Sequence, residues 1–127
     1  MINKTIKHLI TGNQTVSDHV IYITVSLNSR YSMQETQAYA PTSTSDDEKV
    51  RTYEDISKAL KMNRTKFTII TGDFNAKLGS KIQDDPENIG KFGLAERNNR
   101  GKMLLNFLAN KNMYCLNTFL QRPKQRR

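Results

Sequence analysis

Apolar and polar residues alternate early in the chain. Over residues 21–27, isoleucine, valine and leucine alternate with tyrosine, threonine and serine. This period of two is typical of a strand with one buried face. The turn-forming segment Asn28-Ser29-Arg30 follows, and residues 31–39 predict a second strand. The two strands are expected to form an antiparallel hairpin. Residues 5–10 predict an earlier strand.

A helix is predicted over residues 46–61. It begins with a capping box, in which the Ser45 hydroxyl accepts from the amide of Glu48 and the Glu48 carboxylate reaches back. Apolar residues then recur at helical spacing. The side chains expected to face inward are Val50, Tyr53, Ile56, Ser57 and Leu60.

The second half of the chain predicts a strand, a loop, a helix and a last strand. The β-branched run at residues 67–71 predicts a strand buried at the centre of a sheet. Residues 76–97 predict a long surface loop. A helix is expected to begin at Asn98 or Asn99 and to end near Asn112, and residues 113–117 predict a short strand. The inward side chains of this helix are expected to be Met103, Leu104, Phe107 and Leu108.

This order of strands and helices mixes a hairpin with helical crossovers. It excludes a pure helical bundle and a pure β-sandwich, and it favours a layered α/β fold in which helices cover the faces of a mixed sheet. The length of 127 residues suits one domain. We expect that domain over residues 1–120, followed by a basic tail at residues 121–127.

Positive charge is concentrated in the second half. Residues 1–60 carry six Lys/Arg against seven Asp/Glu, a net charge of −1, whereas residues 61–127 carry fourteen against five, a net charge of +9. Four of the positive residues lie within Gln121–Arg127. A basic half indicates a polyanionic partner, with DNA the foremost candidate. A solvated basic surface without a specific partner is the alternative.

The remaining composition points to an intracellular protein. No apolar run approaches the roughly 18 residues of a membrane helix, and no signal peptide is recognisable. The single cysteine, Cys115, cannot form an internal disulfide. We therefore expect a protein of the nucleus or cytoplasm that is not secreted; its oligomeric state is not indicated.

Two strand ends carry polar side chains suited to phosphate chemistry. The strand at residues 67–71 runs into Gly72-Asp73-Phe74-Asn75, and ligands gather at such carboxyl ends in α/β folds. Asp73 can bind a hard cation or accept a proton, and Asn75 can orient a phosphate or a water; a simple Asx-turn is the alternative. Tyr39, which precedes Pro41 at the end of the hairpin, can donate its phenol to a phosphate oxygen. A half-buried tyrosine at a sheet edge is the more common role for such a residue.

These segments together resemble a known superfamily. Tyr39-Ala40-Pro41-Thr42, then a helix, then a strand ending in Thr71-Gly72-Asp73-Phe74-Asn75-Ala76 is similar to the endonuclease/exonuclease/phosphatase superfamily, whose fold is DNase I-like. The segment Gly93–Gly101, with the later Leu116-Asn117-Thr118, resembles the endonuclease domains of LINE-type retrotransposons. The likeness is strongest to the RTE-like group, which includes craniofacial development protein 2-like sequences.

The resemblance implies a Mg²⁺-dependent phosphodiesterase, with Mn²⁺ as a possible substitute, that nicks DNA and has a two-sheet α/β sandwich. Asp73 matches the aspartate that positions or deprotonates the attacking water, and it is also the residue expected to bind the metal ion. Asn75 matches the asparagine that holds the scissile phosphate, and Tyr39 matches a tyrosine that hydrogen-bonds it. The residues expected to contact the DNA are Lys77, Arg97, Asn98 and Arg100.

Two parts of the superfamily pattern have no counterpart at the expected places. These are an upstream metal-binding glutamate in a Gln-Glu-Thr-like motif and a closing Ser-Asp-His. Gln34-Glu35-Thr36 and Ser17-Asp18-His19 imitate them, but both stand at the wrong point in chain order. We predict that Glu35 occupies an ordinary sheet position and that Ser17-Asp18-His19 forms a turn and a strand start.

The sequence therefore predicts part of a nuclease domain, truncated at both ends and catalytically incomplete, with any metal ion weakly bound. A non-catalytic, basic nucleic-acid-binding module is the main alternative. A phosphatase of small molecules or phosphoinositides is a third reading within the same superfamily.

Overall fold

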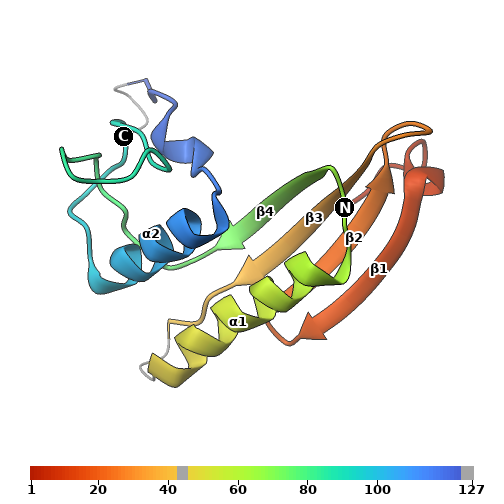
Figure 1. Ribbon diagram of the computed structural model, residues 1–127, viewed down its shortest axis with the longest axis horizontal. Helices are drawn as coiled ribbons and strands as arrows, with labels where there is room; N and C mark the ends of the chain where they lie inside the picture. The colour runs from red at the N-terminus through yellow and green to blue at the C-terminus, as the bar shows by residue number, and fades with distance from the viewer. Residues whose placement is uncertain (43–45, 124–127) are drawn as a thin grey trace. The chain divides into compact units, whose positions relative to one another are not determined.

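A mixed four-stranded sheet with strand order β1-β2-β3-β4 forms the scaffold of the first half of the chain (Figure 1). The computed structural model describes residues 1–42 and 46–123. The chain divides into a first unit, Met1–Phe74, and a second unit, Asn75–Arg127. The elements of the first unit are the 3-10 helix η1 (Lys7–Leu9), β1 (Ile10–Ser17), β2 (Val20–Ser26), β3 (Ser32–Tyr39), α1 (Asp46–Met62) and β4 (Phe67–Asp73). The predicted α/β class, with a mixed sheet and a packed helix, is confirmed.

The predicted hairpin is confirmed as the antiparallel pair β2–β3. Its turn is closed by the side chain of Asn28, whose Oδ1 accepts from the amides of Arg30 at 2.8 Å and Tyr31 at 2.9 Å. The strand predicted at residues 5–10 is wrong, because residues 7–9 form η1 and the strand β1 follows it. β1 is an edge strand with mostly polar, exposed residues, so it carries no hydrophobic alternation to reveal it.

β4 forms where it was predicted, but it lies at the edge of the sheet rather than at its centre. It pairs in parallel with β3, from Met33 opposite Phe67 to Tyr39 opposite Asp73. Phe67 and Ile69 are 47% and 46% exposed. A continuous apolar run is usual for a strand covered on both faces, whereas the residues of β4 are exposed on both faces in the described structure, apart from the half-buried Ile70.

The core of the first unit lies between the sheet and α1, which crosses one face of it (Figure 1). The helix presents Thr52, Ile56 and Ala59, all buried, at a spacing of four and three residues, the spacing of one helical face. The sheet offers Val20, Tyr22, Gln34, Thr36 and Ala38. The two layers are joined by a buried hydrogen bond, in which Gln34 Nε2 donates to the carbonyl of Ala59 at 2.8 Å.

The predicted helix over residues 46–61 is confirmed by α1, but its inward face is partly wrong. Ile56 is fully buried and Tyr53, Ser57 and Leu60 are half-buried, whereas Val50 is 46% exposed. The reason is that the contact face is centred on the small residues Thr52 and Ala59, which allow a close approach to the sheet. The predicted capping box involves Ser45, which lies outside the described residues.

The second unit contains α2 (Asn99–Lys111) and the 3-10 helix η2 (Leu116–Thr118). The predicted second helix is confirmed, with Asn98 as its N-cap and Asn112 in the left-handed region, at φ 52°, as its C-cap. Its buried side chains are Leu104, Leu105, Phe107 and Leu108, and Met103 is half-buried. The strand predicted at residues 113–117 is wrong, because η2 takes part of that segment. No helix in the described part of the chain is long and apolar enough to span a membrane.

The loop predicted at the surface is instead partly interior to the second unit. Ile89 is fully buried, and Leu78 and Asn88 are buried as well. Asn88 Nδ2 donates to the carbonyl of Met113 at 2.7 Å, and the amide of Gly90 donates to Thr118 Oγ1 at 2.7 Å. Hydrogen bonds from side chains therefore organise a segment that has no regular backbone ladder.

Gly72 of β4 lies close to the backbone of β3. This residue has φ 144°, and a Cβ atom built on it would lie 1.7 Å from the carbonyl oxygen of its partner Ala38. Both the dihedral angle and the contact exclude a side chain. Gly72 therefore allows the last residues of β4 to stay in register with β3.

We expect Gly72→Ala to lower the free energy of unfolding by about 2–4 kcal/mol, because the new Cβ must displace the Ala38 backbone and tolerate a strained φ. Urea unfolding followed by circular dichroism measures this change. Gly12→Ala is the matched control, since a Cβ there meets Thr24 Oγ1 at an ordinary 3.9 Å. Equal stability losses in the two variants would contradict the role given to Gly72.

Candidate functional site

The structure brings Tyr39 and Asp73 together. They are register partners at the carboxyl ends of the parallel strands β3 and β4, and the amide of Ala40 donates to the carbonyl of Asp73 at 2.8 Å. Both side chains are exposed, that of Tyr39 by 47%. Two of the three residues predicted as catalytic thus stand side by side at a sheet end, which is where α/β folds commonly bind ligands.

The strand alternation places both side chains on one face. Ala38, which precedes Tyr39, is 2% exposed on the face that α1 covers, and its register partner Gly72 lies on the same side but is exposed. Successive residues of a strand point to opposite faces, so Tyr39 and Asp73 point away from α1. This face, opposite α1, is called the open face below.

Phe74 anchors the end of β4 on the helix side. Its ring stacks against that of Tyr53 in α1, with centroids 6.4 Å apart and an angle of 21°. Burial raises the pKa of the Tyr53 phenol to about 12, so the stack stays uncharged at neutral pH. Gly72 thus allows the close approach of β3, Asp73 is exposed, and Phe74 packs against the helix.

Asn75 begins the second unit, and its backbone is left-handed, at φ 46°. Asparagine is one of the few residues that adopt this conformation readily. Its predicted role in holding the scissile phosphate stays a prediction.

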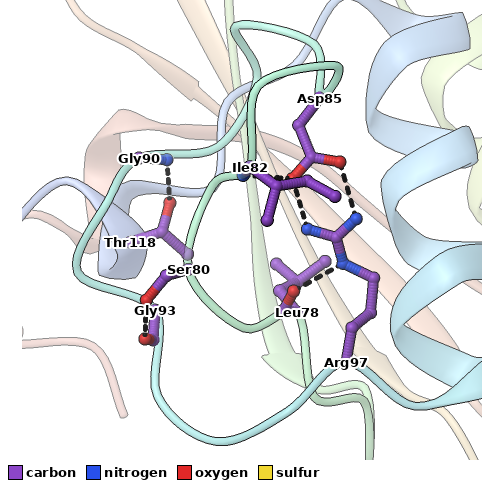
Figure 2. A network of polar contacts seen from close by, with 8 residues as sticks. All are labelled: Leu78, Ser80, Ile82, Asp85, Gly90, Gly93, Arg97 and Thr118. Atoms are coloured by element: carbon purple, nitrogen blue, oxygen red, sulfur yellow. Dashed lines mark hydrogen bonds and ion pairs between the residues drawn. The ribbon is translucent and has the colours of Figure 1, made fainter.

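Arg97, predicted to contact DNA, forms a fork with Asp85 inside the second unit (Figure 2). Its two terminal nitrogens donate to the two carboxylate oxygens at 2.6 and 2.5 Å, and its Nε donates to the carbonyl of Leu78 at 2.7 Å. The Asp85 side chain is only 7% exposed and also accepts from the amide of Ile82 at 2.9 Å. The guanidinium is committed to holding the loop, so a phosphate would have to compete with Asp85 for it.

The Arg97–Asp85 pair shifts the pKa of both groups. The hydrogen bond from Arg97 lowers the pKa of Asp85, against the opposing effect of burial, and the bond to Asp85 raises the pKa of Arg97. No pattern in the sequence indicates this pair, because its members are 12 residues apart in a segment without periodicity.

Asn98 also has a structural task. Its Oδ1 accepts from the amide of Gly101 at 2.8 Å, which caps α2, and from the amide of Lys77 at 3.1 Å. A Cβ on Gly101 would lie 1.9 Å from the Lys77 carbonyl oxygen, so the glycine permits this close packing. Lys77 itself is exposed and Arg100 is half-buried, and their predicted contacts with DNA stay predictions.

The side chains around Asp73 do not form a site that would hold Mg²⁺ by protein ligands alone. Among the described residues no group of three or more His, Cys, Asp or Glu side chains is placed to bind a metal ion. Glu35 shares the open face, but it lies opposite Ile69, four residues back along β3 from Tyr39. Its Oε1 accepts from Thr71 Oγ1 at 3.3 Å. Asp73 thus offers one carboxylate, fewer ligands than an all-protein cage requires.

Positive charge belongs mainly to the second unit. Residues 75–127 carry eleven Lys/Arg against four Asp/Glu, a net charge of +7, whereas residues 1–74 carry nine against eight, a net charge of +1. Lysine side chains exposed on the second unit are Lys77, Lys81, Lys91 and Lys102. Such a distribution suits contact with phosphates.

Comparison with curated proteins finds similarity to craniofacial development protein 2. The chain is 31% identical to that protein from Bos taurus and 30% identical to that from Tragulus javanicus, each over 128 aligned positions and 99% of the chain. These alignments cover 21% and 22% of the relatives, so the chain spans about a fifth of their length. The expected likeness to craniofacial development protein 2 is confirmed. No family model matches the chain, and no solved structure matches it.

The Arg97–Asp85 pair should make stability depend on pH. The folded-state pKa of Asp85 is lowered, so its contribution is fully present above the unfolded-state pKa of about 3.9 and is lost as pH falls through the lower folded value. At pH 7 we expect Asp85→Asn to lower the free energy of unfolding by about 1.5–3 kcal/mol. Urea unfolding between pH 7 and pH 3 should show the wild type converging on the variant.

Asp55→Asn is the matched control. Asp55 accepts from Lys58 at 3.1 Å within α1, but the lysine side chain is 65% exposed, and exposed pairs contribute about 0–1 kcal/mol. Equal effects of the two substitutions, or a constant gap between Asp85→Asn and wild type across this pH range, would contradict the structural role of the pair.

Proposed function

We propose that this chain is part of a phosphodiester-cleaving domain of the endonuclease/exonuclease/phosphatase type, DNase I-like and akin to retrotransposon DNA-nicking endonucleases. The observation that carries the proposal is the register pairing of Tyr39 with Asp73 on the open face at the ends of β3 and β4. DNA is the proposed substrate, which implies an intracellular location in the nucleus or cytoplasm.

The two side chains have complementary chemistry. The phenol of Tyr39 can donate a hydrogen bond to a phosphate oxygen, and the carboxylate of Asp73 can accept a proton from a water or help to orient it. Because both lie at strand ends rather than on a free loop, the distance between them is fixed by the sheet. A phosphate bound at Tyr39 would therefore present its phosphorus on the side where Asp73 stands.

The same site is too sparse for efficient catalysis by this chain alone. Negative charge that develops on a phosphate must be met by fixed donors, and losing one such donor costs about 100- to 1,000-fold in rate. Of Tyr39 and Asp73, Asp73 alone has a carboxylate, and a single carboxylate would hold Mg²⁺ or Mn²⁺ only weakly. We therefore propose that the 127 residues bind DNA but need further parts of a longer domain to cleave it.

We expect no detectable nicking of supercoiled plasmid by the 127-residue chain with Mg²⁺ or Mn²⁺, measured by gel electrophoresis. A chimera, in which these residues replace the matching fifth of bovine craniofacial development protein 2, should nick the plasmid. Asp73→Ala in that chimera should abolish nicking, because several groups that act as a unit fail together.

Asp84→Ala is the matched control in the chimera, since Asp84 is an exposed aspartate of the second unit. An inactive chimera beside an active bovine protein would count against the phosphodiesterase proposal. Nicking by the 127-residue chain that disappears in Asp73→Ala would show that the site is complete as it stands.

A non-catalytic DNA-binding role is the second candidate, favoured by the net charge of +7 in the second unit. In either role, DNA affinity should fall steeply with salt, with a slope of about 0.9 per phosphate contact. Replacing Arg122, Lys124, Arg126 and Arg127 by glutamine removes four positive charges at constant length and should flatten the slope. Fluorescence anisotropy with a labelled duplex measures it.

The matched control replaces four basic residues of the first unit, Lys4, Lys7, Lys61 and Arg64, by glutamine. If both quadruple variants change the slope equally, binding follows net charge alone and the tail has no particular role. If neither changes it, the basic residues of the tail are not DNA contacts.

A further inference from the structure

His19 lies beside Tyr39, on the side away from Asp73. The amide of Tyr39 donates to the carbonyl of His19 at 2.9 Å, and the two rings are 6.1 Å apart between centroids, at an angle of 40°. His19 directly precedes Val20, which is buried against α1. The contact between the two rings places His19 on the open face, the face of Tyr39 and Asp73.

The turn between β1 and β2 fixes the position of this histidine. β1 ends at Ser17 and β2 begins at Val20, and these two residues are register partners, so only Asp18 and His19 lie between them. The amide of His19 donates to Ser17 Oγ at 3.3 Å. The prediction that Ser17-Asp18-His19 forms a turn and a strand start is thereby confirmed, and hydrogen bonds of the His19 backbone with Ser17 and Tyr39 hold this residue within the short turn.

Three side chains thus form a row across neighbouring strands: the imidazole of His19, the phenol of Tyr39 and the carboxylate of Asp73. Neighbouring strands are about 4.8 Å apart, so the ends of the row are about 10 Å apart. A phosphodiester that accepts a hydrogen bond from Tyr39 is within reach of both flanking groups. The imidazole offers an N–H donor to a phosphate oxygen, and the carboxylate occupies the opposite side.

We propose that His19 is a phosphate-contacting residue of the same site. This inference rests on the proposed function, because it takes the ligand to be a phosphodiester, and it names the donor that complements Tyr39. The groups that share its surroundings are Asp18 beside it in the turn, Tyr39 next to it and Asp73 beyond. His19 and Tyr39 would then offer two neighbouring donors to the phosphate oxygens, and Asp73 would lie beyond Tyr39.

The chain has two histidines, His8 and His19, which makes the test direct. Thymidine 3′,5′-bisphosphate is titrated into the intact chain, and the imidazole signals are followed by NMR. The chemical shifts of His19 should change and reach a plateau as the bisphosphate is added, while those of the exposed His8 in η1 should not change. His19→Ala should weaken binding about tenfold, as expected for one hydrogen bond to a charged group, and His8→Ala should leave it unchanged.

His19→Phe separates a phosphate contact from simple ring packing, since it keeps an aromatic ring against Tyr39 but removes the nitrogen donors. We expect this variant to unfold at the same urea concentration as the wild type and to bind the bisphosphate as weakly as His19→Ala. Wild-type affinity in His19→Phe would overturn the proposal. If His19→Phe is unstable, the test uses His19→Gln, which keeps an N–H donor. This variant should bind the bisphosphate more tightly than His19→Ala.

Tyr39→Phe distinguishes this inference from the proposed function. If Tyr39→Phe weakens binding while the His19 signals and variants show no effect, the phosphate site stands and the role of His19 is wrong. If no bisphosphate binds at millimolar concentration, or binding is indifferent to both Tyr39 and His19, the phosphate site itself is wrong and the inference falls with it.

Discussion

The parallel register between β3 and β4 places Asp73 beside Tyr39, the pair on which the candidate site depends. Gly72 makes this register possible, because its hydrogen occupies the space that a methyl group would contest with the Ala38 carbonyl. A slip of one residue would turn Asp73 to the face that α1 covers. Phe74, stacked on Tyr53, resists such a slip from the helix side. The position of Asp73 beside Tyr39 therefore depends on one short segment of chain, Gly72 to Phe74.

The two units use different physics to hold their functional segments. In the first, a sheet and a helix bury apolar and small residues, and the site residues project from the other face. In the second, the loop before α2 is held by side-chain hydrogen bonds, above all the fork between Arg97 and Asp85 (Figure 2). This explains why a glycine-containing loop can have a fully buried residue, Ile89. The positive residues of this unit therefore differ in their surroundings: Arg97 binds Asp85 and holds the loop, whereas the exposed lysines face the solvent.

The sequence predicted the elements with strong periodicity and missed those held by specific contacts. The hairpin and both helices follow from spacing and caps, as with Asn98 and Asn112. β1 was not predicted, because its residues are mostly polar and it lies at the edge of the sheet. β4 was predicted at the centre of the sheet, because apolar composition does not distinguish an open face from a covered one. The two residues that the motif named, Tyr39 and Asp73, are register partners at the ends of β3 and β4, and their role in a site stays a prediction. The motif could not show that Arg97 is engaged by Asp85, because that depends on the path of a loop.

The sequence distance between the paired site residues also shapes the order in which structure is gained. The β1–β2 and β2–β3 pairs close short loops, whereas Tyr39 and Asp73 are 34 residues apart with all of α1 between them. The entropy lost on closing a loop grows with its length, so this pairing is the least local step in building the sheet. A chain that has formed only its hairpins and α1 has most of its regular structure but no site. The chemistry of the open face therefore belongs to the completed unit and to none of its parts.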